Sequence, residues 1–176
     1  MKASVIGCGS IGRRHIKIFQ KLGVSISAYN RGMRRRLKAK NDFDIPVYGS
    51  ITQMLSNEAP DFVVIASPNS FHLAHISQAI ASDAHIFIEK PLSHNLTDLN
   101  QAIREVRAKK LITHIGSNMR FHKGPIKVKQ LLNDGIIGRP VSAHLWVSSY
   151  LPAWHPTEDH RKMYSAKKEL GGGVVL

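Results

Sequence analysis

Hydrophobic and polar residues follow two different periods along the first two thirds of the chain. Short apolar runs, typical of buried strands, alternate with segments in which apolar residues recur every three or four positions, as in helices. The expected strands are residues 3–6, 24–29, 46–48, 62–66, 85–88 and 111–116. The expected helices are residues 11–22, 31–41, 51–56, 69–81 and 95–110, the second being a basic helix or loop. This alternation predicts the α/β class, with a doubly wound parallel sheet covered by helices on both faces.

Three of these helices allow finer predictions. Ser50 precedes the third helix, and Asn69 or Ser70 precedes the fourth. Side chains of these types commonly cap the free N–H groups of a first helical turn. The fifth helix is amphipathic, and the residues expected on its buried side are Leu96, Leu99, Ile103 and Val106.

The pattern changes after residue 118. A helix is expected at residues 126–133 and a strand of another sheet at residues 140–150. The rest of the chain has too few apolar residues to close a second core by itself. We therefore expect one complete domain, residues 1–118, followed by the opening part of an incomplete α+β domain, residues 119–176.

Three glycines stand between the first strand and the first helix, in the spacing G-x-G-x-x-G. In a dinucleotide-binding unit, Gly7 allows a sharp turn, Gly9 lets the backbone approach a pyrophosphate, and Gly12 lets the helix pack on the strand. Ser10 and Ile11 open the helix, whose free N–H groups attract phosphate. The flanking strand and helix favour a Rossmann-type nucleotide site over a plain structural turn.

The end of the second strand bears on which dinucleotide binds. NAD-preferring folds usually place an acidic residue there for the adenosine ribose, but this chain has Asn30 and Arg31. No carboxylate repels a 2′-phosphate, and a guanidinium is available to bind it. The sequence therefore favours NADP over NAD, with the alternative that Arg31 is a solvated charge.

Polar residues also follow the fourth and fifth strands. Ser67, Pro68 and Asn69 come where backbone groups and short side chains could contact a ribose or nicotinamide. Glu89 and Lys90 come at the corresponding edge after the fifth strand, where burying a lysine is costly without a partner or ligand. Lys90 is thus a candidate site residue, with a surface turn as the alternative.

Composition limits the classes of function. The formal charge of +13 would suit a protein that binds nucleic acid. No known nucleic-acid-binding motif accompanies the basic residues, however, so we expect this protein not to bind nucleic acid. The apolar runs are too short to cross a membrane, and the glycines and arginines end the first run too early for a signal peptide. A single cysteine, Cys8, fits a reduced cytoplasmic setting. The ten histidines show no metal-ligand spacing, so no metal is expected.

Four segments together resemble the Gfo/Idh/MocA oxidoreductase family, the group named for glucose–fructose oxidoreductase and inositol dehydrogenase. They are residues 7–15 in the glycine turn, 67–72 after the fourth strand, the Glu-Lys-Pro tripeptide 89–91, and Asn-Met-Arg-Phe at 118–121. Residues 151–156 and 170–173 are similar to a branch whose members often handle sugars or sugar-derived acids.

The resemblance implies hydride transfer between a nicotinamide cofactor and a carbinol carbon of a sugar, polyol or related compound. By this resemblance, Lys90 would hydrogen-bond the reacting oxygen and help to position the nicotinamide. Glu89 and Pro91 would fix the lysine, and His72 would line the cofactor cleft. Glu89 and Lys90 are thus also expected among the cofactor-binding residues. Family members pair subunits through the later open sheet, so a completed chain could form a homo-oligomer.

The family's Asp and general acid/base His follow the triple-glycine segment, beyond Leu176, the last residue of this chain. We therefore expect cofactor binding more than turnover. The alternative is a non-catalytic cofactor-binding or partner-binding chain, in which exposed apolar residues are covered by another protein. Those residues are Leu145, Trp146, Val147 and Trp154.

Overall fold

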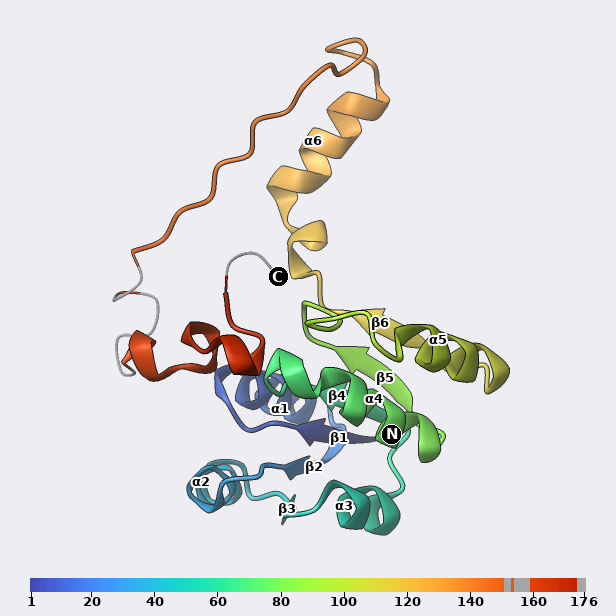
Figure 1. Cartoon of the computed structure of the whole chain (residues 1–176), viewed down its shortest axis with the longest axis vertical. Helices are drawn as coiled ribbons and strands as arrows, with labels where there is room; N and C mark the ends of the chain where they lie inside the picture. Colours follow the sequence, from blue (N-terminus) through green and yellow to red (C-terminus); the bar gives the residue numbers. More distant parts are fainter. Residues whose placement is uncertain (151–152, 154–158, 174–176) are drawn as a thin grey trace. The chain divides into compact units, whose positions relative to one another are not determined.

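A computed structural model describes residues 1–150, 153 and 159–173. Its contacts divide the chain into two compact units (Figure 1). The first contains Met1–Gly116 together with Tyr164–Leu176, and the second contains Ser117–Met163. These contact units do not test the expected division into domains at residue 118, which stays a prediction.

A six-stranded parallel sheet forms the centre of the first unit. The strands are β1 (Lys2–Ile6), β2 (Ser25–Tyr29), β3 (Val47–Tyr48), β4 (Phe62–Ile65), β5 (His85–Ile88) and β6 (Thr113–Ile115). Their order is β3-β2-β1-β4-β5-β6, so the chain reverses direction across the sheet between β1 and β4. This order confirms the doubly wound Rossmann arrangement, whose ligand crevice lies at that reversal.

Helices cover both faces of the sheet (Figure 1). They are α1 (Ser10–Lys21), α2 (Met33–Phe43), α3 (Ile51–Glu58), α4 (His72–Ala81) and α5 (Leu99–Ala108). Buried residues of α1 and α2 share one hydrophobic cluster with the sheet, and those of α3, α4 and α5 share the other. The prediction of a sheet covered on both faces is therefore confirmed.

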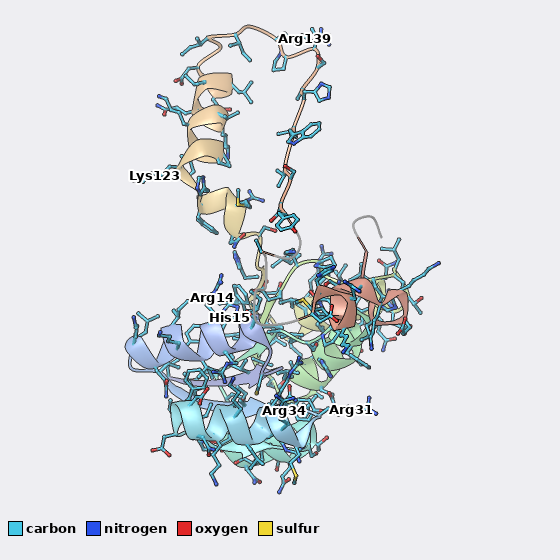
Figure 2. All side chains as sticks on the ribbon, turned by 90° about the vertical axis from the view of Figure 1, so that its left-hand side faces the viewer. Arg14, His15, Arg31, Arg34, Lys123 and Arg139 are labelled. Carbon is cyan, nitrogen blue, oxygen red and sulfur yellow. The ribbon has the colours of Figure 1, made fainter. Side chains whose placement is uncertain are left out.

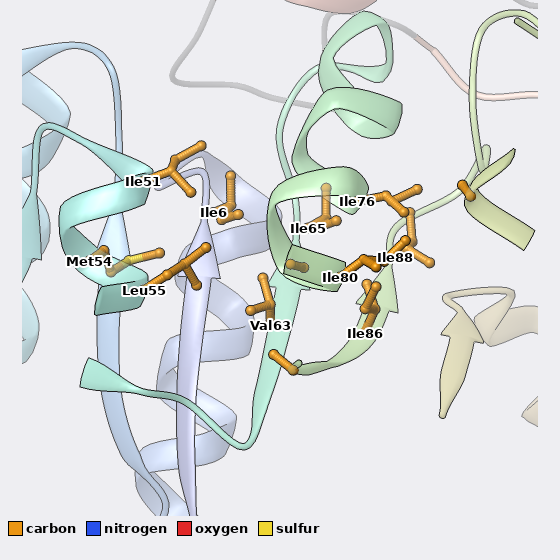
Figure 3. Packing of buried hydrophobic residues seen from close by; sticks show 13 residues of the cluster. Ile6, Ile51, Met54, Leu55, Val63, Ile65, Ile76, Ile80, Ile86 and Ile88 are labelled. Carbon is orange, nitrogen blue, oxygen red and sulfur yellow. The ribbon is translucent and has the colours of Figure 1, made fainter. Parts of the chain in front are cut away.

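The two hydrophobic clusters follow from the apolar strands. Val63, Val64 and Ile65 are fully buried, and neighbours in sequence face opposite sides of the sheet. Figure 3 shows Val63 and Ile65 packed with Met54 of α3 and Ile80 of α4. An unbroken apolar strand thus supplies both clusters at once.

The structure confirms the predicted start of one helix, α3, and differs from the predicted starts of α4 and α5. The Ser50 hydroxyl accepts a hydrogen bond from Gln53 N, which confirms the expected cap of α3. Asn69 caps no helix, because it lies in a 3-10 turn, η1 (Asn69–Phe71), that precedes α4. The fifth helix begins at Leu99 rather than residue 95, and Asn95 Oδ1 instead accepts a hydrogen bond from Thr97 N.

The buried side expected for the fifth helix is partly wrong. Leu96 lies before the helix and is 81% exposed, and Ile103 is also exposed. The buried residue of this helix is Ala102, and Val106 packs at the edge of the cluster. The buried face of the fifth helix is therefore centred on the small residue Ala102.

The second unit holds a 3-10 turn, η2 (Asn118–Phe121), and α6 (Lys123–Asn133). The expected helix at 126–133 is confirmed and starts earlier. The strand expected at residues 140–150 is wrong, because these residues form no helix or strand. A strand needs a partner for its backbone groups, and among the described residues none pairs with this segment.

No helix in the described ranges has both the length and the apolar character needed to cross a membrane.

Candidate dinucleotide-binding site

The turn between β1 and α1 is built from backbone contacts that only glycine permits. Gly7 has φ +108°, and a Cβ on it would lie 2.6 Å from the carbonyl oxygen of Ala66. A Cβ on Gly12 would lie 1.7 Å from the carbonyl oxygen of Gly7. Both distances are far inside van der Waals contact. These two glycines therefore bring β1, β4 and α1 together at the crevice.

Gly9 is different, because a Cβ there would have no atom within 4 Å. It is the N-cap of α1, and no side chain caps this helix end. The first turn carries no acidic residue, and Ser10 and Ile11 are exposed. An open space in front of free N–H groups and a positive helix end suits a pyrophosphate. The residues present therefore fit the dinucleotide expected from the sequence.

Asn30 connects the loop after β2 to the glycine turn. Its side-chain Oδ1 accepts a hydrogen bond from Cys8 N at 3.1 Å, and its Nδ2 donates to the Gly32 carbonyl at 3.1 Å. Both ends of this amide are therefore used within the protein. The next residue, Arg31, is exposed and lies with Arg34 at the α2 side of the unit (Figure 2).

Arg36 fixes the same loop, a role that the sequence analysis missed. Its Nη1 donates to the carbonyl oxygens of Asn30 at 3.2 Å and Arg31 at 2.9 Å. A Cβ on Gly49 would lie 3.0 Å from the same nitrogen. No sequence signal separates this arginine from its basic neighbours, because its partners are backbone carbonyls.

Cys8 lies inside the glycine turn and is buried. Its thiol donates to the Tyr29 carbonyl, with 3.6 Å between sulfur and oxygen. Burial raises the pKa of this thiol to about 11, against the smaller lowering effects of Arg13 and Arg35. Cys8 is therefore protonated at neutral pH, as a small buried residue of the turn rather than a nucleophile.

The Glu-Lys-Pro turn follows β5. The Glu89 carboxylate lies 2.8 Å from Nε2 of His15, and both side chains are mostly buried. The His15 ring also contacts the ring of Phe87, with 5.1 Å between centroids. Lys90 is exposed, and its peptide bond with Pro91 is cis. His15 of helix α1 thus holds Glu89, the residue next to the candidate catalytic residue Lys90.

His15 was missed as a site residue. It comes three residues after Gly12 and so shares the helix face that packs on the sheet. This spacing is the sequence signal that could have identified His15 as a residue near the site. Figure 2 shows His15 next to Arg14 on α1.

His72 is fully buried and lies away from the cleft surface. Its Nδ1 is 2.9 Å from the Pro91 carbonyl oxygen, and its Nε2 is 2.9 Å from that of Ser67. The ring therefore connects the loop after β4 with the loop after β5. This placement suits a residue that positions both loops, and its expected contact with the cofactor stays a prediction.

Ser67 and His75 form a second polar contact at this edge. The Ser67 hydroxyl lies 2.9 Å from Nδ1 of His75. Burial, with a smaller effect of His72, lowers the pKa of His75 to about 4. His75 is therefore neutral near pH 7. Pro68 lies between Ser67 and the 3-10 turn η1 and is partly buried.

A pocket of about 570 Å³ lies on the β1–β3 half of this edge. It is lined by Tyr29, Gly49, Ser50, Ile51, Thr52, Ala74, His75 and Gln78. Tyr29 ends β2, the strand that precedes Asn30 and Arg31. In the described part of the chain, no three His, Cys, Asp or Glu side chains are arranged to hold a metal ion.

Gly9, which has open space around it, and Gly12, which is tightly packed, predict different effects of substitution by alanine. Gly9→Ala should fold normally, because its Cβ meets no protein atom, but should weaken dinucleotide binding by about tenfold or more, because the Cβ occupies the approach to the phosphates. Gly12→Ala should lower stability by about 1–3 kcal/mol or more, because the helix must move. Thermal unfolding and NADH fluorescence titration measure both effects. A Gly9→Ala protein that binds as tightly as wild type would contradict this assignment.

His75 predicts a loss of stability in acid. The unfolded chain takes up this proton near pH 6.5, whereas the folded protein does so only near pH 4. The folded state is therefore destabilised as the pH falls from about 6.5 to about 4. We expect His75→Gln to reduce the drop in free energy of unfolding between pH 7 and pH 4, measured by urea denaturation. His144→Gln, at an exposed histidine, should keep the wild-type drop. An unchanged drop in His75→Gln would show the prediction to be wrong.

Known sequences agree with this geometry. The family model described as "Oxidoreductase family, NAD-binding Rossmann fold" matches residues 1–117. Myo-inositol 2-dehydrogenase of Thermotoga maritima is 28% identical over 180 residues, which cover 100% of this chain and 51% of that protein. Inositol 2-dehydrogenase/D-chiro-inositol 3-dehydrogenase of Halalkalibacterium halodurans is 27% identical over 147 residues, covering 80% and 42%. The chain thus spans about half the length of these relatives.

Solved structures show the same fold. Myo-inositol 2-dehydrogenase from Lactobacillus plantarum superposes with a TM-score of 0.73 at 24% identity, over 79% of this chain and 42% of that one. An oxidoreductase from Agrobacterium radiobacter, solved with NAD+, L-tartaric acid and magnesium, superposes with a TM-score of 0.72 at 25% identity, over 80% and 42%. With the family model matching two thirds of its length, this chain belongs to the Gfo/Idh/MocA family of NAD-binding oxidoreductases.

Proposed function

We propose that this chain binds a nicotinamide dinucleotide for hydride transfer to or from a carbinol carbon of a sugar, polyol or sugar-derived compound. The observation that carries the proposal is the open space at Gly9, in front of the uncapped N-terminus of α1. The substrate class is supported by relatives named as inositol dehydrogenases. The expected setting is the cytoplasm, and self-association of the protein is part of the proposal.

Lys90 is the proposed catalytic residue. It is exposed after β5, next to Glu89, which His15 holds. An ammonium group there would hydrogen-bond the reacting oxygen and stabilise charge as it develops. Glu89 and His72 are assigned to positioning, because Glu89 is bonded to α1 and His72 is buried between two loops.

For the cofactor, we propose that the loop after β2 favours NADP. Asn30 is used within the protein, so Arg31 is the exposed group of this pair. Arg36 holds the backbone of both residues through two carbonyls. The loop thus presents a guanidinium and no carboxylate, an arrangement suited to a 2′-phosphate. The pocket beside Tyr29 would take the adenosine end.

Turnover tests the function. With NAD+ or NADP+ and a polyol such as myo-inositol, we expect at most a slow rise in absorbance at 340 nm, because the family's general acid/base His is not among the residues of this chain. Lys90→Met should lower the rate by about 10²–10³-fold, because a charge-stabilising donor is lost, with a much smaller effect on NADH affinity. Lys110→Met, at an exposed lysine after α5, is the control. Cofactor binding without any reduction of NAD+ or NADP+ would contradict hydride transfer by this chain and favour the alternative of a non-catalytic cofactor-binding chain.

Cofactor preference is tested separately. Arg31→Ala should weaken NADPH binding by about tenfold and leave NADH binding unchanged, because only NADPH carries the 2′-phosphate. Arg104→Ala, at an exposed arginine of α5, should change neither. Fluorescence titration gives both affinities. Tighter binding of NADH than NADPH by the wild type would contradict the proposed preference.

A second candidate is a cofactor-binding protein that acts through a partner. It is favoured by the exposure of Leu145, Trp146 and Val147, of which Trp146 is 85% exposed. Trp154, expected to belong to the same surface, lies outside the described residues. The mass of the protein in solution, compared with that of a single chain, tests this candidate.

A further inference from the structure

Residues 164–173, which we call the strap, pack with the first unit although they follow the second unit in the chain. The strap contains two 3-10 turns, η4 (Tyr164–Ala166) and η5 (Lys168–Leu170), and then a run of glycines. Contacts join η5 to η1, the turn that follows β4. Figure 1 shows the strap in red beside the first unit.

One buried hydrogen bond attaches the strap to the loop after β4. Asn69 Nδ2 donates to the Gly171 carbonyl oxygen at 2.9 Å. Asn69 is 7% exposed and Gly171 is buried. A buried amide left without its partner is costly, so this bond resists opening. It also explains why Asn69 caps no helix.

The shape of the strap matches the surface beneath it. Gly171 has φ +76°, and a Cβ on it would lie 2.8 Å from Cβ of Asn69 and 3.1 Å from Cβ of His94. A Cβ on Gly172 would lie 2.5 Å from the Tyr164 carbonyl oxygen, so the strap is also folded tightly on itself. The strap therefore touches the loops after both β4 and β5.

These loops border one half of the predicted dinucleotide site. The loop that bonds Gly171 also contacts the glycine turn, since a Cβ on Gly7 would lie 3.0 Å from Ser67 N. The end of β2 faces the adenosine ribose in this fold, so the β4–β6 half faces the nicotinamide. The strap also reaches the loop that follows the Glu-Lys-Pro turn, because a Cβ on Gly171 would lie 3.1 Å from Cβ of His94.

We propose that the strap forms part of the wall of the nicotinamide half of the site, with the Asn69–Gly171 hydrogen bond as its latch. The proposal rests on the proposed dinucleotide binding and deepens it. Asn69, expected from the sequence to contact the cofactor, is then a positioning residue that holds the wall in place. The nucleotide-binding unit accordingly needs residues from two separate stretches of the chain.

Two ligands separate this role from a general effect on folding. ADP reaches only the adenosine half and the N-terminus of α1, whereas NADH also needs the nicotinamide half. We expect Gly171→Ala to weaken NADH binding by about tenfold and to change ADP binding less than twofold. Gly135→Ala is the matched control, because Gly135 has φ +69° but no atom within 4 Å of its Cβ. It should leave both affinities unchanged, as measured by calorimetry on the whole chain.

Asn69→Ser is a second variant, for use if Gly171→Ala does not fold. It removes the Asn69–Gly171 hydrogen bond without adding atoms. It should give the same selective loss of NADH affinity. Equal weakening of NADH and ADP, or no weakening of either, in the folded variant would overturn the proposal. Failure of the wild-type chain to bind either ligand would instead overturn the proposed function.

Discussion

The structure depends on one close contact of backbone with backbone, where the glycine turn meets the end of β4. No side chain fits between Gly7 and Ala66, or between Gly12 and Gly7. Because the three backbones touch, α1 starts directly above the gap between β1 and β4. The sheet order reverses at the same gap, so the positive end of the helix and the crevice coincide.

Side chains that bind backbone carbonyls hold the surrounding loops. Arg36 binds two carbonyls after β2, and His72 lies between carbonyls after β4 and β5. Asn30 adds a bond to the glycine turn itself. Loops fixed in this way need little rearrangement when a ligand arrives, so less binding free energy is lost to ordering them. The exposed groups, Arg31 and Lys90, are carried by the fixed loops.

Local pattern predicted the sheet well, because its strands are short apolar or alternating segments that lie between helix signals. It predicted the glycine turn for the same reason. It failed at Asn69, whose partner Gly171 is 102 residues away in sequence. It also failed at Arg36, whose partners are nearby backbone carbonyls that any residue could supply. The alternating residues 140–150 show the converse, since alternation forms no strand without a neighbouring strand.

The buried thiol of Cys8 has a practical consequence. It is the single cysteine of the chain, its pKa is raised to about 11, and it is bonded to the Tyr29 carbonyl. The reactive thiolate is therefore scarce at neutral pH, and reagents cannot reach it while the domain is folded. A cysteine introduced on the surface would be the one site that maleimide dyes or spin labels modify, without first removing the native residue.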